Sequence, residues 1–458
     1  MTLDPGFSIL ATSMTTLTPA KIAQLRALMS ALPAALSARI VEAAGAGDEA
    51  MGQLLHACTR KAEVYARERF FSPVAPLSLD PALARPSLAH IPPAMLATVW
   101  GWLDETLAPD ITSDMKARCA NPLLPPDDRA EDGLRADASR RILATIDELR
   151  DDPRATKQLR HRLGVSDFRA VRDLATILRT APVLRAAMAG IPEEVSELSE
   201  ELAQTLRDQY DEACAADPDA GVWFLYLVMA RLTRPWAILR VFEKIVRRDD
   251  DFLLSRTDVS TIGDALLEDA AYYVSGFAEI PASIEAAREM AAALTQFATV
   301  TVGMSREIGI RKDGGWGRQI LALRQRASAQ MEAIHAAALT QLDKTVPDPH
   351  KPLPARLKLS GEALASAATR MEVFCTFLRL TRDDASRAAV GGAHAGVLDR
   401  IGQRFDMVSE MLLAQMRNTP GDSDLTERAA VIARLMTAMG QQDIASVFLR
   451  RAAAARAA

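Results

Sequence analysis

The chain has 458 residues, enough for roughly two to four domains, and can bury a core without disulfides or bound metal. Hydrophobic residues make up 49% and aromatic residues only 5%, so the apolar share is mainly Ala, Leu, Val, Ile and Met, which favours helices over strands. The net charge of −5, without a long block of Lys or Arg, argues against general nucleic-acid binding.

The first 128 residues predict an N-terminal helical region with a proline-rich insertion at 71–93. Thr18 and Pro19 are typical of a helix start, and further helices are expected from near Leu36 and over 48–70. The density of prolines after residue 72 cannot sustain an α-helix, so this insertion should be polyproline or irregular. A short helix with two tryptophans should follow, before a second break at 121–128.

Residues 129–345 predict a central helical domain. Pro192 is expected to open a long helix with an apolar stripe from Val195 to Tyr210, and acids between 193 and 201 on its solvated face. The helices expected around it cover 131–150, 156–163, 166–179, 261–277, 281–305 and 318–344, the last with an apolar seam that requires partner helices.

The most apolar stretch is "VWFLYLVMARLTRPWAILRVFEKIVRR" at 222–248. Its uninterrupted apolar run is too short for a membrane span, which needs about twenty residues, and extending it brings in several arginines. We therefore expect two core helical segments that meet near Pro235.

"VPDPHKPLP" at 346–354 predicts a linker, and 355–458 a C-terminal helical bundle. Asp424 with Glu427 resembles a capping box, and Gly440 is expected just past a helix end. The bundle helices are expected near 360–380, 383–389, 397–417, 425–439 and 442–456. The whole pattern predicts an all-α fold, a multi-helical array that ends in this bundle.

No local pattern predicts a catalytic residue, a cofactor or a metal site. The four cysteines are widely spaced without a CxxC pair, which fits a reducing cytoplasm, and the Ala- and Arg-rich composition suggests a bacterial source. The N-terminus does not resemble a signal peptide. Glu332 and His335 form only half of a di-iron ligand set, and "GMSRE" at 303–307 lacks the second glycine of a nucleophile elbow.

Two stretches are candidate binding sites. The segment after Pro235 has an apolar face and a basic edge, a pattern found in helices that bind membrane surfaces or partner grooves. Its candidate binding residues are Trp236, Arg240, Lys244, Arg247 and Arg248. "GIRKDGGWGRQ" fails as a phosphate-binding loop because Gly315 and Trp316 replace the required Lys and Ser/Thr. Its glycines and basic residues before a helix could still bind an anion, at Arg311, Lys312, Gly314, Gly315 and Arg318.

The leading functional hypothesis is a non-catalytic helical scaffold or adaptor that binds a protein partner, because helical seams are frequent and catalytic motifs are missing. The alternative is an enzyme whose site is assembled from residues distant in sequence, with an anion site near 311–318. Peripheral membrane binding through 234–248 is a weaker alternative.

Overall fold

The computed structural model describes residues 31–47, 62–80, 85–119, 127–246, 260–307, 314–348, 359–388 and 391–457, with His350 and scattered residues between 24 and 58. These residues are overwhelmingly helical, and among them a single isolated β-bridge joins Val195 to Leu232. The predicted all-α, multi-helical fold is confirmed. None of the described helices is both long and apolar enough to cross a membrane.

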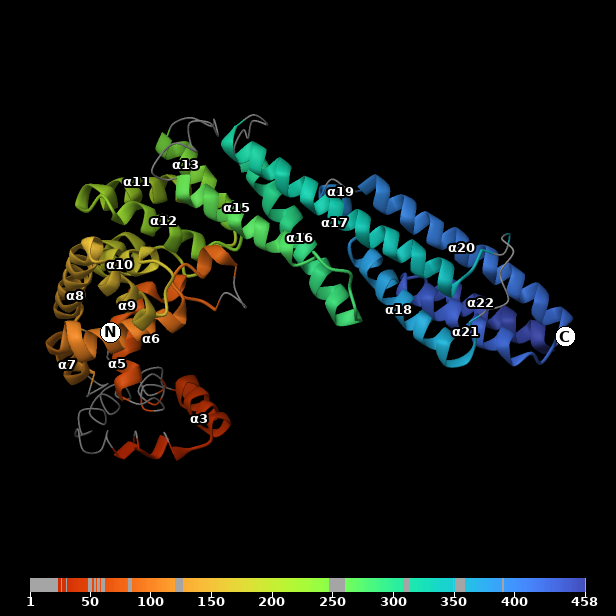
Figure 1. The fold of residues 1–458 in the computed structure, drawn as a ribbon, viewed down its shortest axis with the longest axis horizontal. Coiled ribbons are helices and arrows are strands. Elements are labelled where there is room, and N and C mark those ends of the chain that lie inside the picture. The colour runs from red at the N-terminus through yellow and green to blue at the C-terminus, as the bar shows by residue number, and fades with distance from the viewer. Residues whose placement is uncertain are drawn as a thin grey trace, which may run out of the picture. The chain divides into compact units, whose positions relative to one another are not determined.

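The chain divides into two compact units, Met1–Thr233 and Arg234–Ala458 (Figure 1). The division lies within the apolar stretch 222–248, between Thr233 and Arg234, so the two helical segments of this stretch belong to different units. The limits predicted at 128, 345 and 355 for three domains remain predictions.

The described part of unit 1 consists of α-helices and short helical turns. Its α-helices are α3 (Ala34–Gly47), α5 (Ala62–Phe70), α6 (Pro93–Trp102), α7 (Pro109–Arg118), α8 (Asp128–Glu148), α9 (Pro153–Leu163), α10 (Arg169–Met188), α11 (Glu200–Ala216) and α12 (Ala220–Arg231). The connecting turns are the 3₁₀ segments η1 (Ser72–Leu77), η2 (Pro86–Leu88) and η4 (Leu149–Asp151), and the π segment η3 (Leu103–Leu107).

The proline-rich insertion differs from its prediction. Pro73 at the second position of η1 and Pro86 at the first position of η2 lie where a missing N–H costs no hydrogen bond, while Pro76 lies inside η1. Val74 and Leu77 of η1 are completely buried. The insertion therefore contributes 3₁₀ turns to the core.

Helix α10 is central to unit 1, because it packs against α8, α11, α12 and η1. Ala175 and Ala181 are buried on it, and Ser139 of α8 donates a 2.6 Å hydrogen bond to the carbonyl of Ala175. The helix was predicted to end at Arg179, yet it continues through Pro182. Pro182 is exposed, and the buried residues Ala181 and Leu184 near it keep the helix packed on the core despite the roughly 3 kcal/mol that an internal proline costs.

The prediction of a helix from Pro192 is wrong over its first turns. Gly190, with φ of 82°, follows α10, and residues 192–199 form no α-helix. Within this segment Val195 exchanges backbone hydrogen bonds with Arg231 and Thr233 at 2.9 and 3.0 Å. Helix α11 begins only after Ser199, whose hydroxyl accepts from the N–H of Leu202.

Helix α12 contains the apolar half of the stretch 222–248, and it is a core helix. Trp223, Phe224 and Leu225 are at most 7% exposed. The ring of His90 packs edge-on against Trp223 with centroids 5.2 Å apart.

Unit 2 contains η5 (Pro235–Ile238), α13 (Leu239–Val246), α15 (Ser260–Ser275), α16 (Ile284–Glu307), α17 (Gly315–Thr345), α18 (Gly361–Leu380), α19 (Asp384–Arg387), α20 (Gly391–Asn418), α21 (Ser423–Ala438) and α22 (Gln442–Ala457). Helices α15, α16, α18 and α17 pack in one ring, and α17, α18, α21 and α20 in a second. Helix α22 covers α20 and α21. The predicted apolar seam of α17 is confirmed, since residues such as Ala327, Met331 and Ala338 are completely buried.

Helix ends in the C-terminal part of unit 2 follow local chemistry. Gly440 takes a φ of 83° just past α21, as predicted. The capping-box prediction is wrong by two residues, because Asp422 caps α21 by accepting from the N–H groups of Asp424 and Leu425.

Two tryptophans of unit 2 pack directly onto helical glycines. A Cβ atom on Gly263 of α15 would lie 2.0 Å from Trp316, and one on Gly303 of α16 would lie 2.3 Å from Trp236. Gly303, the first residue of "GMSRE", therefore leaves the space that the indole ring of Trp236 occupies. A contact this close leaves no room for a larger residue.

Candidate functional site

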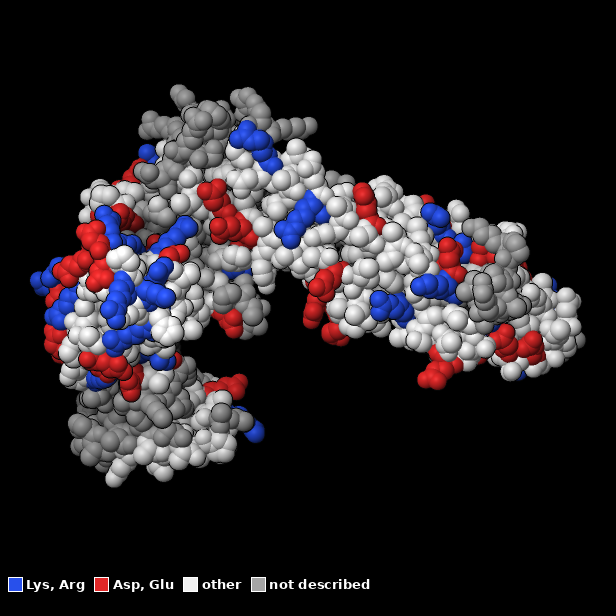
Figure 2. Space-filling model, in the orientation of Figure 1, with Lys and Arg blue, Asp and Glu red and all other residues white. Residues whose placement is uncertain are grey.

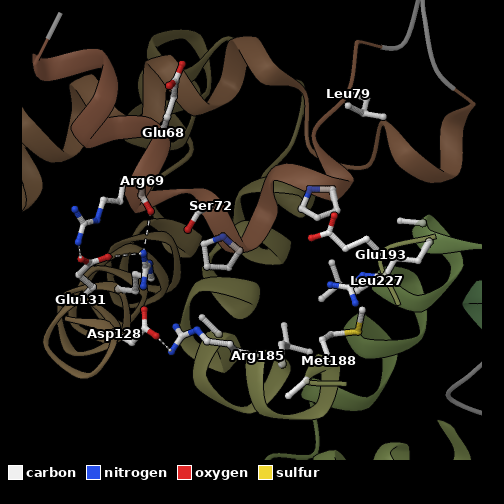
Figure 3. Close-up of a pocket in the computed structure, with 18 of the residues that line it drawn as sticks. Glu68, Arg69, Ser72, Leu79, Asp128, Glu131, Arg185, Met188, Glu193 and Leu227 are labelled. Carbon is white, nitrogen blue, oxygen red and sulfur yellow. Dashed lines mark hydrogen bonds and ion pairs between the residues drawn. The ribbon is translucent and has the colours of Figure 1, made fainter. Parts of the chain in front are cut away.

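Unit 1 contains a cleft of about 1030 Å³, lined by segments far apart in the sequence (Figure 3). The lining comes from α5 and η1, the start of α8, the second half of α10, the 189–193 segment and the end of α12. The apolar residues that line the cleft include Leu79, Leu184, Met188 and Leu227. The charged lining residues are Glu68, Arg69, Asp128, Glu131, Arg135, Arg185, Glu193 and Arg231.

Arg135 of α8 links the cleft to the core. It is 2% exposed, and its Nε and Nη2 donate to the carbonyl oxygens of Phe70 and Arg69 at 2.9 and 2.8 Å. The same guanidinium donates to Asp132 at 2.9 Å and to Glu131 at 3.1 Å. Arg135 thus satisfies two carbonyls at the end of α5 and neutralises buried carboxylates on its own helix.

Two further arginines extend this network to the cleft surface. Arg69 donates to the second oxygen of Glu131, and Arg185 of α10 donates to Asp132 at 2.6 Å. The hydrogen bond with Asp132 raises the pKa of Arg185 above its ordinary value. These three arginines and two carboxylates form what we call the Arg135 network, and it holds α5, α8 and α10 together.

The other end of the cleft lies between the 189–193 segment and the end of α12. Arg231 donates a 2.6 Å hydrogen bond to the carbonyl of Ile191, which fixes its guanidinium against this segment. Among the described residues, no carboxylate lies within 4 Å of that guanidinium. Glu193 projects into the cleft, with Met188 and Leu227 nearby (Figure 3). The backbone pairing of Val195 with Arg231 places Glu193 there.

Sequence reasoning missed the Arg135 network, although a signal for it exists. Ile146, Ile142 and Ala138 mark the buried stripe of α8, and steps of three and four residues continue that stripe back to Arg135 and Glu131. Charged residues at core positions of a helix indicate either a buried ion network or a site.

The candidate residues on the basic edge lie in unit 2. Trp236 is half-buried on Gly303, and Arg240 is paired with Glu307 of α16 at 2.6 Å. This pairing reduces the positive charge that the edge offers to a lipid surface. Lys244 is half-buried, while Arg247 and Arg248 lie outside the described residues.

The candidate anion site is described only in part. Gly314 is the N-cap residue of α17 and is buried, Gly315 is half-buried, and Arg318 is exposed. Arg311 and Lys312 lie outside the described residues. The indole N–H of Trp316 in this stretch donates to Asp264 of α15 at 3.0 Å, so the tryptophan has a structural contact.

On the face shown in Figure 2, acidic and basic side chains intermingle around α8, without one sign dominating. Comparison of the chain with protein-family models, with curated proteins and with solved structures gives no match.

Proposed function

We propose that the protein is a non-catalytic helical scaffold that binds a protein partner through the cleft of unit 1. The observation that carries the proposal is the composition of the cleft, which combines apolar walls with the internally paired charges of the Arg135 network at one end and Arg231 at the other. An apolar groove with fixed polar groups at its edges is typical of sites that bind a segment of another protein.

The pairing of the carboxylates with arginines in the Arg135 network favours a binding function over a catalytic one. Glu131 and Asp132 each accept hydrogen bonds from two arginines, so neither stands as an unpaired proton acceptor toward the cleft. The convergence of charges from distant segments is the one feature that favours the alternative, an assembled enzyme site.

The charges at the Arg231 end indicate the chemistry of the partner. Arg231 is held by a carbonyl, and among the residues that the structure describes no carboxylate forms an ion pair with it. A partner segment with apolar side chains and an acidic group would place those side chains near Met188 and Leu227, and its carboxylate on Arg231.

Site-specific cross-linking tests this proposal. A photoreactive amino acid replaces Leu79, which is 41% exposed and lines the cleft, and a control replaces Leu321 of α17, which is 49% exposed and lies outside it. We expect Leu79 to cross-link a defined protein segment in the producing cells, and Arg231→Glu to abolish that product. Equal products at both positions would contradict the proposal, as would a small molecule recovered at Leu79.

A further inference from the structure

Two buried histidines of unit 2 form a hydrogen-bonded chain across three helices. Nε2 of His335 on α17 lies 3.1 Å from Nδ1 of His394 on α20. Nε2 of His394 lies 3.0 Å from the carbonyl oxygen of Leu378 on α18. The two histidines are only 5% and 1% exposed. The chain lies where both helix rings of unit 2 share α17 and α18.

The hydrogen-bond partners constrain how the neutral pair carries its protons. A carbonyl can only accept, so Nε2 of His394 carries the proton and Nδ1 is the acceptor. His335 must then donate from its own Nε2. A protonated His394 could donate from Nδ1 only if the proton of His335 moved to its own Nδ1. A proton on both rings would set two N–H groups against each other, so the closed arrangement cannot hold both histidines protonated.

The surroundings oppose a positive charge on either ring. Burial lowers the pKa of His335 to about 4, with a further contribution from His394, and burial also lowers the pKa of His394. Burial outweighs the hydrogen bond to the Leu378 carbonyl, which acts to raise the pKa of His394. The positive charge of Arg382, beyond the end of α18, lowers that pKa further. Glu332 is exposed one turn earlier on α17, and Asp384 of α19 accepts from Thr295 and Arg387.

We propose that the His335–His394 pair is a pH-operated joint, in which proton uptake below neutrality breaks the contact between α17 and α20. An imidazole in the opened joint takes up a proton near its ordinary pKa of about 6.5. The closed joint therefore keeps its full stability above that pH, and loses it as the pH falls from about 6.5 toward 4. Acidification would open the second helix ring of unit 2 between α17 and α20.

Hydrogen exchange of the full chain tests this joint. Protection factors, corrected for intrinsic exchange rates, are measured for amides of α17 and α20 at pH 7.5 and 5.5. We expect protection to fall about tenfold at pH 5.5 for each imidazole that takes up a proton only in the opened joint. The double variant His335→Gln with His394→Gln should lose much less protection between pH 7.5 and 5.5. The control variant His350→Gln removes an exposed histidine and should lose as much protection as the wild type.

A separate measurement on the wild type covers the case in which the double variant does not fold. The side-chain nitrogen resonances of His335 and His394 should show neutral rings down to about pH 5. Protonation of the two rings should coincide with loss of hydrogen-exchange protection in α20. Titration of both rings near pH 6.5, without any loss of protection, would overturn the proposal. Equal loss of protection in the wild type and a folded double variant would overturn it as well.

Discussion

Replacing Arg135 with methionine should lower the unfolding free energy of unit 1 by about 3–5 kcal/mol, because each of two buried carboxylates loses the most deeply buried of its two arginine partners. Glu131 and Asp132 are 2% and 9% exposed, so water cannot replace the lost guanidinium. The carbonyls of Arg69 and Phe70 lose their donor as well. Denaturant unfolding followed by hydrogen exchange in α8 and α10 reports unit 1 separately from unit 2.

A matched control on the same helix is Arg140→Met. Arg140 is also paired with an aspartate, Asp137, three residues away, but its side chain is 76% exposed. We expect Arg140→Met to change the unfolding free energy of unit 1 by at most about 1 kcal/mol. Adding Glu131→Gln and Asp132→Asn to Arg135→Met should restore part of the stability, since the buried charges are then removed. Equal effects of Arg135→Met and Arg140→Met would show that the Arg135 network does not hold unit 1 together.

The second large effect is expected for Gly263→Ala in α15, which should destabilise unit 2 by about 1–3 kcal/mol or more. The new methyl group would lie 2.0 Å from the ring of Trp316. Trp316 is 1% exposed and donates to Asp264, so its ring cannot move aside without losing burial and a hydrogen bond. Thermal unfolding, with hydrogen exchange in α15 and α17, measures the change.

Gly402→Ala in α20 is the control for this substitution, because it makes the same chemical change on a helix with open space around the new methyl group. Apart from its chain neighbours and the backbone of its own helix, no atom lies within 4 Å of a Cβ built there. The variant should gain about 0.5–1 kcal/mol from helix propensity. A gain in stability for Gly263→Ala would contradict the close packing of Trp316 on α15.

Local signals predicted much of the fold. The end of α9 follows from Gly164, which takes a φ of 68°, and the seam of α17 follows from apolar spacing. The errors occur where tertiary contacts override local preference. Pro182 lies inside α10, and Pro192 precedes a non-helical segment that pairs with the end of α12. Neither outcome can be read from a window of neighbouring residues.

The candidate site was harder to predict from the sequence than the fold. Arg69, Arg135 and Arg185 come from three helices, and their convergence depends on how α5, α8 and α10 pack. His335 and His394 are likewise 59 positions apart and meet only through the packing of α17 and α20. Local motifs describe sites built from neighbouring residues, whereas these two clusters depend on long-range packing.

The affinity of the cleft for the segment recovered at Leu79 is the most direct measure of the proposed function. A synthetic peptide of that segment is titrated calorimetrically into the wild type, Arg231→Ala and the control Arg140→Ala. We predict that Arg231→Ala weakens binding by about tenfold or more, because a hydrogen bond to a charged group contributes roughly 1.5–3 kcal/mol, and that Arg140→Ala binds like the wild type. Equal affinity for all three proteins would contradict binding through the cleft of unit 1.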